Sequence, residues 1–142
     1  MKFLEQTPAF LFFTGKGGVG KTSLACATAI YLADLGKRGL LVSTDPASNV
    51  GQVFGITIGN QITPVSAVAN LSALEIDPQA AAQIYRDKIV GPVRGVLPDA
   101  VVNSIEDLLT GACTTEIAAF DEFTGLLTNQ SLISQFEHII FD

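Results

Sequence analysis

The stretch FFTGKGGVGKTS, residues 12–23, decides the fold of this 142-residue chain. Its residues 15–22 match the phosphate-binding loop pattern G-x-x-x-x-G-K-[ST]. Four glycines in the loop permit tight turns, so backbone N–H groups can surround a triphosphate without an intruding side chain. The residues expected to contact a nucleotide are Gly15, Lys16, Gly17, Gly18, Val19, Gly20, Lys21, Thr22 and Ser23.

The flanking sequence supplies the structural context that such a loop requires. Residues 9–13 are apolar and predict a buried strand, and residues 22–35 carry apolar side chains at helical spacing. The helix N-terminus would add its dipole to anion binding. We expect Lys21 to reach the β- and γ-phosphates of ATP and the Thr22 hydroxyl to ligate Mg²⁺. The alternative is a glycine-rich turn that binds no ligand.

The rest of the chain alternates strands with helices, which predicts an α/β fold with a mostly parallel sheet and helices on both faces. Gly36 is expected at the C-terminal cap of the first helix, and Asp77 before Pro78 is typical of a helix N-terminus. Residues 50–72 are irregular apart from a short helix. We predict further strands at 37–44, 71–77 and 134–142, and further helices at 78–90, 98–109 and 114–127.

The last of these helices has a candidate packing face. Its large apolar side chains are expected on one side of the helix, and they are Ile117, Phe120, Phe123, Leu126 and Leu127. Two acids of the same helix, Asp121 and Glu122, fit a solvated face better than acid–base chemistry, although a contact with a partner stays open.

Two aspartates follow predicted strands at the edge of the sheet where ligands bind in such folds. Asp45 follows the strand expected next to the phosphate loop, and its carboxylate could orient the water that attacks the γ-phosphate. The alternative for Asp45 is a helix cap before Pro46. Asp142 ends an apolar strand, where an acid can hold the water shell of Mg²⁺. Because the chain stops on Asp142, we expect a fragment of a longer protein or a truncated gene product.

Composition excludes several classes of protein. The net charge of −6 argues against non-specific binding to nucleic acid or anionic lipid. No apolar stretch reaches the roughly 18 residues that span a membrane, and the N-terminus lacks a signal-peptide pattern. These features predict a cytoplasmic location, where two cysteines do not make a disulfide framework. The 48% hydrophobic content against 15% charged residues indicates surface that other parts of a protein would cover.

The two cysteines and the lone histidine differ in their surroundings. Cys113 precedes a predicted helix, where a thiol tends to be reactive, and thiolates bind soft metals and metalloids. A partly buried structural cysteine is the alternative reading of Cys113. Cys26 lies among alanines of the first helix and is interpreted as core, and His138 is interpreted as structural.

Four segments together resemble a known family. These are GKGGVGKT with the extra Lys16, the segment STDPASN at 43–49, the segment GACTTEIAAFDEFTGLL at 111–127, and the strand that ends in Asp142. The loop resembles the deviant Walker A (SIMIBI-type) P-loop ATPases, which include arsenical pump, tail-anchored-protein targeting, MinD and ParA proteins. The resemblance to arsenical pump-driving ATPases covers essentially the whole chain.

The resemblance implies a reaction and roles for particular residues. The reaction is ATP + H₂O → ADP + phosphate, driving arsenite or antimonite out through a membrane permease. Catalytic roles fall on Asp45, Lys16 and Lys21, with Lys16 reaching the nucleotide of an opposing ATPase half rather than standing as a solvated loop lysine. Thr22, Asp45 and Asp142 would serve Mg²⁺. Cys113 would be one thiol ligand of the metalloid activator, with the remaining ligands beyond Asp142.

The resemblance also implies partners and a place in the cell. The partners are the arsenite permease, a metallochaperone that delivers the metalloid, and a second ATPase half in tandem or as a dimer, but no nucleic acid. The protein would be cytoplasmic and peripheral at the inner membrane. Residues 1–142 would form the N-terminal part of the domain, and alone we expect them to be inactive or weak, below about 1 s⁻¹. The alternatives are a tail-anchored-protein targeting ATPase, a ParA-like partitioning ATPase and a non-catalytic truncated remnant.

Overall fold

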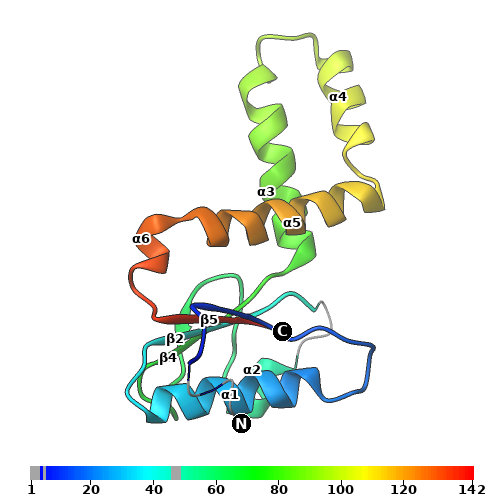
Figure 1. Cartoon of the computed structure of the whole chain (residues 1–142). Helices are drawn as coiled ribbons and strands as arrows, with labels where there is room; N and C mark the ends of the chain where they lie inside the picture. The colour runs from blue at the N-terminus through cyan, green and yellow to red at the C-terminus, as the bar shows by residue number, and fades with distance from the viewer. Residues whose placement is uncertain (1–3, 5, 46–48) are drawn as a thin grey trace.

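The computed structural model of the chain describes residue 4, residues 6–45 and residues 49–142. Strands and helices alternate in the first part of the chain, as predicted, and a run of helices precedes the last strand (Figure 1). In chain order the elements are β1 (Phe10–Phe12), α1 (Lys21–Asp34), β2 (Gly39–Ser43), α2 (Val50–Phe54), β3 (Thr63–Pro64), β4 (Leu71–Glu75), α3 (Pro78–Val90), the 3₁₀ turn η2 (Gly91–Val93), α4 (Asp99–Leu108), α5 (Ala112–Thr128), α6 (Gln130–Ile133) and β5 (His138–Phe141).

The five strands form one sheet in the order β1-β5-β2-β4-β3. All neighbouring strands are parallel except β3, which pairs antiparallel with β4. The sequence placed the strand before Asp45 next to the strand of the phosphate loop, and that adjacency is wrong. The last strand, β5, lies between them and pairs with both, because the α1 crossover leaves room for one strand between β1 and β2.

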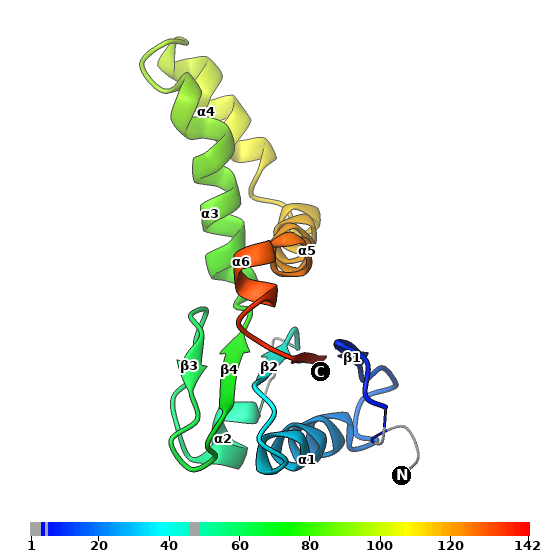
Figure 2. The same cartoon turned by 60° about the vertical axis from the view of Figure 1, so that its left-hand side comes forward.

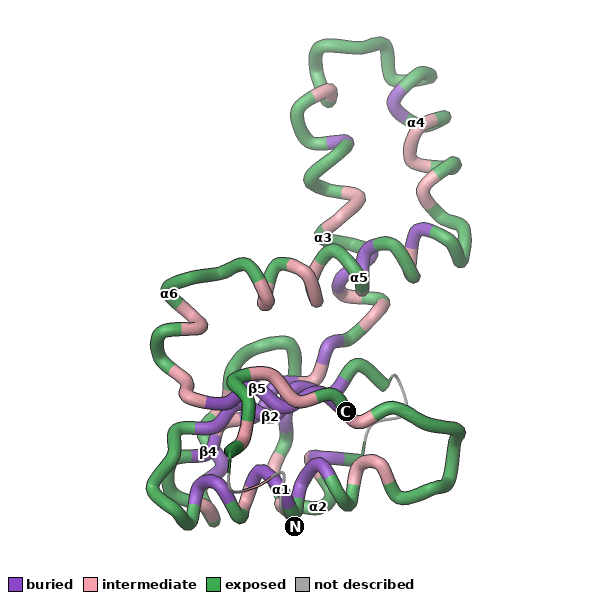
Figure 3. Tube along the Cα trace, in the orientation of Figure 1, coloured by how far each residue is buried: buried purple, intermediate pink, exposed green. Residues whose placement is uncertain are grey.

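Successive side chains of the central strands point to opposite faces of the sheet, so the core has two halves. Leu41 and Ile140 face α1, whose inner side presents the small side chains of Ala25, Cys26 and Ala29. Their neighbours in the sequence face the opposite way and pack under α5 and α6, and they are Leu40, Val42, Ile139 and Phe141. Buried residues accordingly concentrate in the sheet and along the side of α1 that faces it (Figure 3). Helices therefore cover both faces of the sheet, as the sequence predicted.

The helix ends follow from local sequence. Gly36, at φ 80°, follows the C-terminal residue of α1, and the N–H of Lys37 donates to the Leu32 carbonyl at 3.0 Å. Asp77 caps α3, since its Oδ1 accepts from the N–H groups of Gln79 at 2.8 Å and Ala80 at 3.3 Å. The predicted Asp77 cap is confirmed. The C-terminal cap that was predicted at Gly36 lies one residue earlier, at Leu35.

The helices α3 and α4 form a hairpin that rises away from the sheet, joined at its base to α5 (Figures 1 and 2). Where α5 crosses α3, the contact consists of small side chains, Ala81 and Ala82 against Ala118, with Tyr85 beside them. Small residues let two helix backbones approach closely. Among the described residues, no helix combines the length and apolar character needed to cross a bilayer.

The apolar face predicted for α5 is divided in the structure. Phe123, Leu126 and Leu127 pack on the sheet as expected. Ile117 and Phe120 stay 53% and 65% exposed, because the first half of the 17-residue helix packs on α3 through Ala118 instead. Of the two acids, Asp121 is exposed and its Oδ2 lies 3.5 Å from Lys88 Nζ, whereas Glu122 is half-buried.

Candidate nucleotide site

The glycine loop connects β1 to the N-terminus of α1, which is the context the sequence predicted. Gly18 and Gly20 adopt φ values of 75° and 85°, which favour glycine over residues with a Cβ. Gly20 is the N-cap of α1, and the first turn of this helix carries no acidic side chain. The N–H groups of the first turn have no partners within the helix and their dipoles attract anions. The loop can therefore bind phosphate.

The most informative contact of the site joins residues 120 positions apart. The Thr22 hydroxyl donates to Asp142 Oδ2 at 2.7 Å. Asp142 is only 7% exposed, and its other carboxylate oxygen, Oδ1, is buried and has no hydrogen-bond partner among the described residues. The fold thus brings together two of the three residues that the sequence assigned to Mg²⁺, and these two lie near opposite ends of the chain.

These oxygens fit Mg²⁺, which prefers hard oxygen ligands and keeps several waters. The Thr22 hydroxyl would ligate the ion, and Asp142 would hold its water shell through the otherwise unpartnered Oδ1. The part of the chain that the structure describes holds no cluster of three or more His, Cys, Asp or Glu residues that could bind a metal without help. When bound, Mg²⁺ neutralises charge on the phosphates.

The backbone around Asp142 is fixed by the neighbouring strand. The Asp142 N–H donates to the Val42 carbonyl at 2.9 Å, and its own carbonyl accepts from the Thr44 N–H at 3.0 Å. The Thr44 hydroxyl also donates to the Asp142 carbonyl at 3.2 Å. Sequence reasoning did not single out Thr44. The position of its hydroxyl directly before Asp45 was the one sequence feature that could have indicated a role. The contact of Thr44 with Asp142 depends on the pairing of β2 with β5, which was not predicted.

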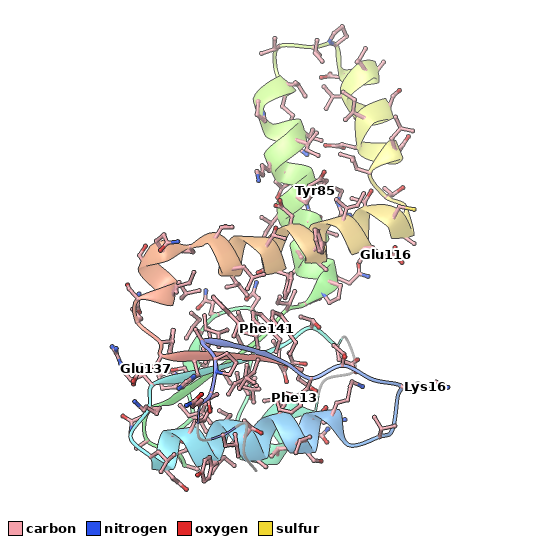
Figure 4. All side chains as sticks on the ribbon, in the orientation of Figure 1. Phe13, Lys16, Tyr85, Glu116, Glu137 and Phe141 are labelled. Atoms are coloured by element: carbon pink, nitrogen blue, oxygen red, sulfur yellow. The ribbon has the colours of Figure 1, made fainter. Side chains whose placement is uncertain are left out.

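The two loop lysines point in different directions. Lys21 Nζ donates to the Lys16 carbonyl at 3.5 Å and so lies over its own loop. The Lys16 side chain points outward from the loop, away from the body of the molecule (Figure 4). The structure therefore groups Lys21 with the loop and leaves Lys16 to face outward.

Asp45 follows β2 at the edge of the sheet where Asp142 also lies. Its N–H donates to Ser43 Oγ at 3.4 Å, and the residue lines a cavity of about 380 Å³ together with Glu75 and Asp77. The next described helix, α2, has Asn49 as its N-cap, and the alternative reading of Asp45 as a helix cap before Pro46 stays open. The remainder of the switch segment, Pro46 to Ser48, lies outside the described residues.

The cysteines divide as the sequence indicated. Cys113 is the second residue of α5 and is exposed. Cys26 is buried at 2% exposure, and burial together with the nearby Asp142 charge raises its thiol pKa to about 11. The core assignment of Cys26 is confirmed. His138 is buried, and its Nδ1 lies 2.9 Å from the Pro8 carbonyl, in keeping with a structural role.

A parallel sheet, a glycine loop on the N-terminus of a helix and a Thr–Asp pair at the strand ends define a P-loop nucleotide-binding protein. Comparison of sequences then gives the family. The sequence model of the anion-transporting ATPases matches residues 8–142, and the chain belongs to this family.

Relatives that match this chain over its full length share one description. The chain is 75% identical over all its 142 residues to an arsenical pump-driving ATPase of Escherichia coli and 72% identical to one of Acidiphilium multivorum. It covers only 24% of each of these relatives, about a quarter of their length. An ATPase named GET3 from Mycosarcoma maydis is 47% identical over 79 residues, which is 56% of this chain and 24% of that relative.

Proposed function

We propose that this chain is the first nucleotide-binding part of an ATPase that drives extrusion of arsenite or antimonite. The reaction would be hydrolysis of ATP, with Mg²⁺, to ADP and phosphate. The observation that carries the proposal is the Thr22–Asp142 contact of 2.7 Å at the mouth of the glycine loop, with Asp142 Oδ1 buried and open to a water of Mg²⁺. That arrangement suits a metal-bound triphosphate.

Each polar residue of the site has a proposed role. Lys21 binds the β- and γ-phosphates, and backbone N–H groups of residues 15–20 surround them. Asp45 orients the attacking water and lies close to the Mg²⁺ ion. The outward direction of Lys16 supports its assignment to the nucleotide of an opposing ATPase half, because that side chain does not turn back onto its own loop.

The metalloid would be the activator and the cargo of the pump. Cys113 is exposed and would supply one thiolate, with further thiolates from elsewhere in the full-length protein. The proposed partners are a membrane arsenite permease, a metallochaperone and a second ATPase half. A cytoplasmic protein attached to the inner membrane through the permease fits these partners and the acidic net charge of −6.

A tail-anchored-protein targeting ATPase is the second candidate. Its support is the 47% identity to a GET3 ATPase, but that match extends over 56% of the chain. The matches to arsenical pump-driving ATPases extend over 100% of it at 71–75% identity. The longer and stronger match favours the pump.

The deciding experiment is steady-state ATP hydrolysis by the full-length protein with and without antimonite. We expect antimonite to raise turnover and Cys113→Ser to abolish the increase. Cys26→Ala is the matched control, since it removes the other thiol of this chain and should leave the increase intact. Hydrolysis at a rate that antimonite leaves unchanged would contradict the pump and favour the targeting ATPase.

A further inference from the structure

Three phenylalanine rings connect α5 to the two strands that lead into the nucleotide site, and a fourth lies beside them on α5. The ring of Phe123 lies 5.0 Å from that of Phe141 and 6.2 Å from that of Phe12, measured between centroids. Phe12 and Phe141 stack at 4.8 Å with an interplanar angle of 6°. Phe120 lies 6.1 Å from Phe123 and makes no ring contact with either strand among the described residues. Phe123 is thus the α5 phenylalanine whose ring contacts the rings at both strand ends.

Both strand ends continue directly into the site. Phe12 closes β1 and stands three residues before Gly15, the first residue of the glycine loop. Phe141 closes β5 and precedes Asp142. The two are partners in the parallel register, and the Phe13 N–H donates to the Phe141 carbonyl at 2.9 Å. A displacement of the Phe123 ring would therefore reach the loop and the Mg²⁺ acid together.

The helix that carries Phe123 also carries Cys113. Ala118, midway between them in the sequence, is the point where α5 rests on Ala81 and Ala82 of α3. A helix rises 1.5 Å per residue, so Cys113 and Phe123 lie about 15 Å apart on one rigid element. With its close contact at Ala118, α5 has the geometry of a lever: a pull at one end moves the other end in the opposite direction. Phe141 is 3% exposed and so lies in the close-packed interior, which transmits strain, whereas Phe12 is 51% exposed.

We propose that Phe123 is a positioning residue that couples Cys113 to the nucleotide site. This inference rests on the proposed function, because it names how metalloid at Cys113 changes hydrolysis. When metalloid bound at Cys113 displaces the N-terminal end of α5, the Phe123 ring shifts against the rings of Phe12 and Phe141. This shift changes the positions of the glycine loop and of Asp142. The part of this coupling that acts on binding is reciprocal, so bound nucleotide changes the affinity of Cys113 for metalloid by the factor by which metalloid changes the affinity for nucleotide.

The test compares two substitutions in the full-length protein, Phe123→Leu and Phe120→Leu. They change the same residue type on the same helix, but of these two rings only that of Phe123 contacts rings of the described strands. The readout is the ratio of kcat with antimonite to kcat without it, together with KM for ATP. Allosteric coupling is typically 5- to 150-fold, so we expect Phe123→Leu to lower the ratio at least about threefold and Phe120→Leu to leave it unchanged.

A second readout separates coupling from binding. Antimonite should still protect Cys113 from alkylation in Phe123→Leu, but nucleotide should no longer strengthen that protection. If Phe123→Leu lowers the melting temperature strongly, Phe123→Met keeps the apolar volume without the ring and should show the same loss of ratio.

The outcomes are distinct. An unchanged ratio in Phe123→Leu, or an equal loss in Phe120→Leu, overturns the coupling role while metalloid activation stands. If metalloid does not activate the unsubstituted protein at all, the proposed function is wrong, and the coupling role of Phe123 is then wrong as well.

Discussion

At the scale of single residues, the hydroxyl of Thr22 makes a testable contribution. It donates to the buried Asp142 carboxylate at 2.7 Å, and the same oxygen is the one expected to ligate Mg²⁺. A hydrogen bond to a charged group contributes about 1.5–3 kcal/mol, so Thr22→Ala should lower kcat/KM for Mg-ATP about tenfold or more. Steady-state kinetics over a range of Mg²⁺ concentrations measures this, and the Mg²⁺ requirement should rise as well.

Thr22→Ser is the matched control for that loss. It keeps the hydroxyl and removes only the methyl group, so its kcat/KM should stay within about threefold of the unsubstituted protein. Equal losses in the Ser and Ala variants would show that the methyl packing matters and the hydroxyl does not.

Glu122 gives a prediction about pH. Burial, and then the charge of Asp77, raise the pKa of its carboxyl group above the ordinary 4.5. A raised pKa means that the folded state disfavours the ionised form, so a destabilising contribution develops as pH rises above 4.5 and is complete above the folded-state pKa. Glu122→Gln, which carries no charge, should therefore unfold less readily than the unsubstituted protein at pH 7.

Urea unfolding of both proteins at several pH values checks the sign. The advantage of Glu122→Gln should shrink as pH falls towards 4 and be nearly absent there, because Glu122 is then largely protonated in both states. Asp121→Asn is the control on the adjacent, exposed acid, which is paired with Lys88 at 3.5 Å. An advantage that is independent of pH would contradict the role of ionisation.

At the scale of elements, the start of α3 depends on one side chain. Asp77 Oδ1 accepts two backbone N–H groups, and α3 in turn supports α5 through Ala81 and Ala82. Losing an N-cap of this kind costs about 1 kcal/mol, so Asp77→Ala should lower the free energy of unfolding by roughly that amount. Asp77→Asn preserves the cap and should lie within a few tenths of a kcal/mol of the unsubstituted protein. A loss in Asp77→Asn as large as that in Asp77→Ala would mean that charge, and not capping, holds the helix.

The elements that the sequence predicted well are those with local signals. A capping Asp before Pro78 and a glycine after α1 mark helix ends within a few residues, and both appear in the structure. The position of β5 between β1 and β2 has no such signal, because strand order is decided by pairing across the whole sheet. The exposure of Ile117 and Phe120 was missed for a similar reason: periodicity gives a helix face, but only the docking on α3 decides which part of it is covered.

At the scale of the whole molecule, the same distinction applies to the site. The glycine loop is a local motif, and its residues were predicted together. Thr22 and Asp142 were each assigned to Mg²⁺ separately, and their 2.7 Å contact follows only from the parallel pairing of β1 with β5. Thr44 and the ring contacts of Phe123 depend on the same pairing and could not be read from spacing.

Lys21 and Lys16 point in different directions, so we expect Lys21 to act in nucleotide binding and Lys16 to act between two ATPase halves. Lys21 lies over its own loop, so Lys21→Ala should remove most of the stabilisation that a non-hydrolysed ATP analogue gives. Ligand at 100 times its Kd stabilises by about 2.7 kcal/mol, which is roughly 5–10 °C in Tm for a domain of this size.

Lys16 should behave differently, because its side chain points away from the loop (Figure 4). Lys16→Ala should keep the Tm increase with the analogue, measured by thermal melting, yet lower the kcat of the full-length protein, where an opposing nucleotide is within reach. Lys16→Arg keeps the positive charge and serves as the control. If Lys16→Ala loses the Tm increase as completely as Lys21→Ala, both lysines serve one nucleotide, and the proposed contact across two ATPase halves is wrong.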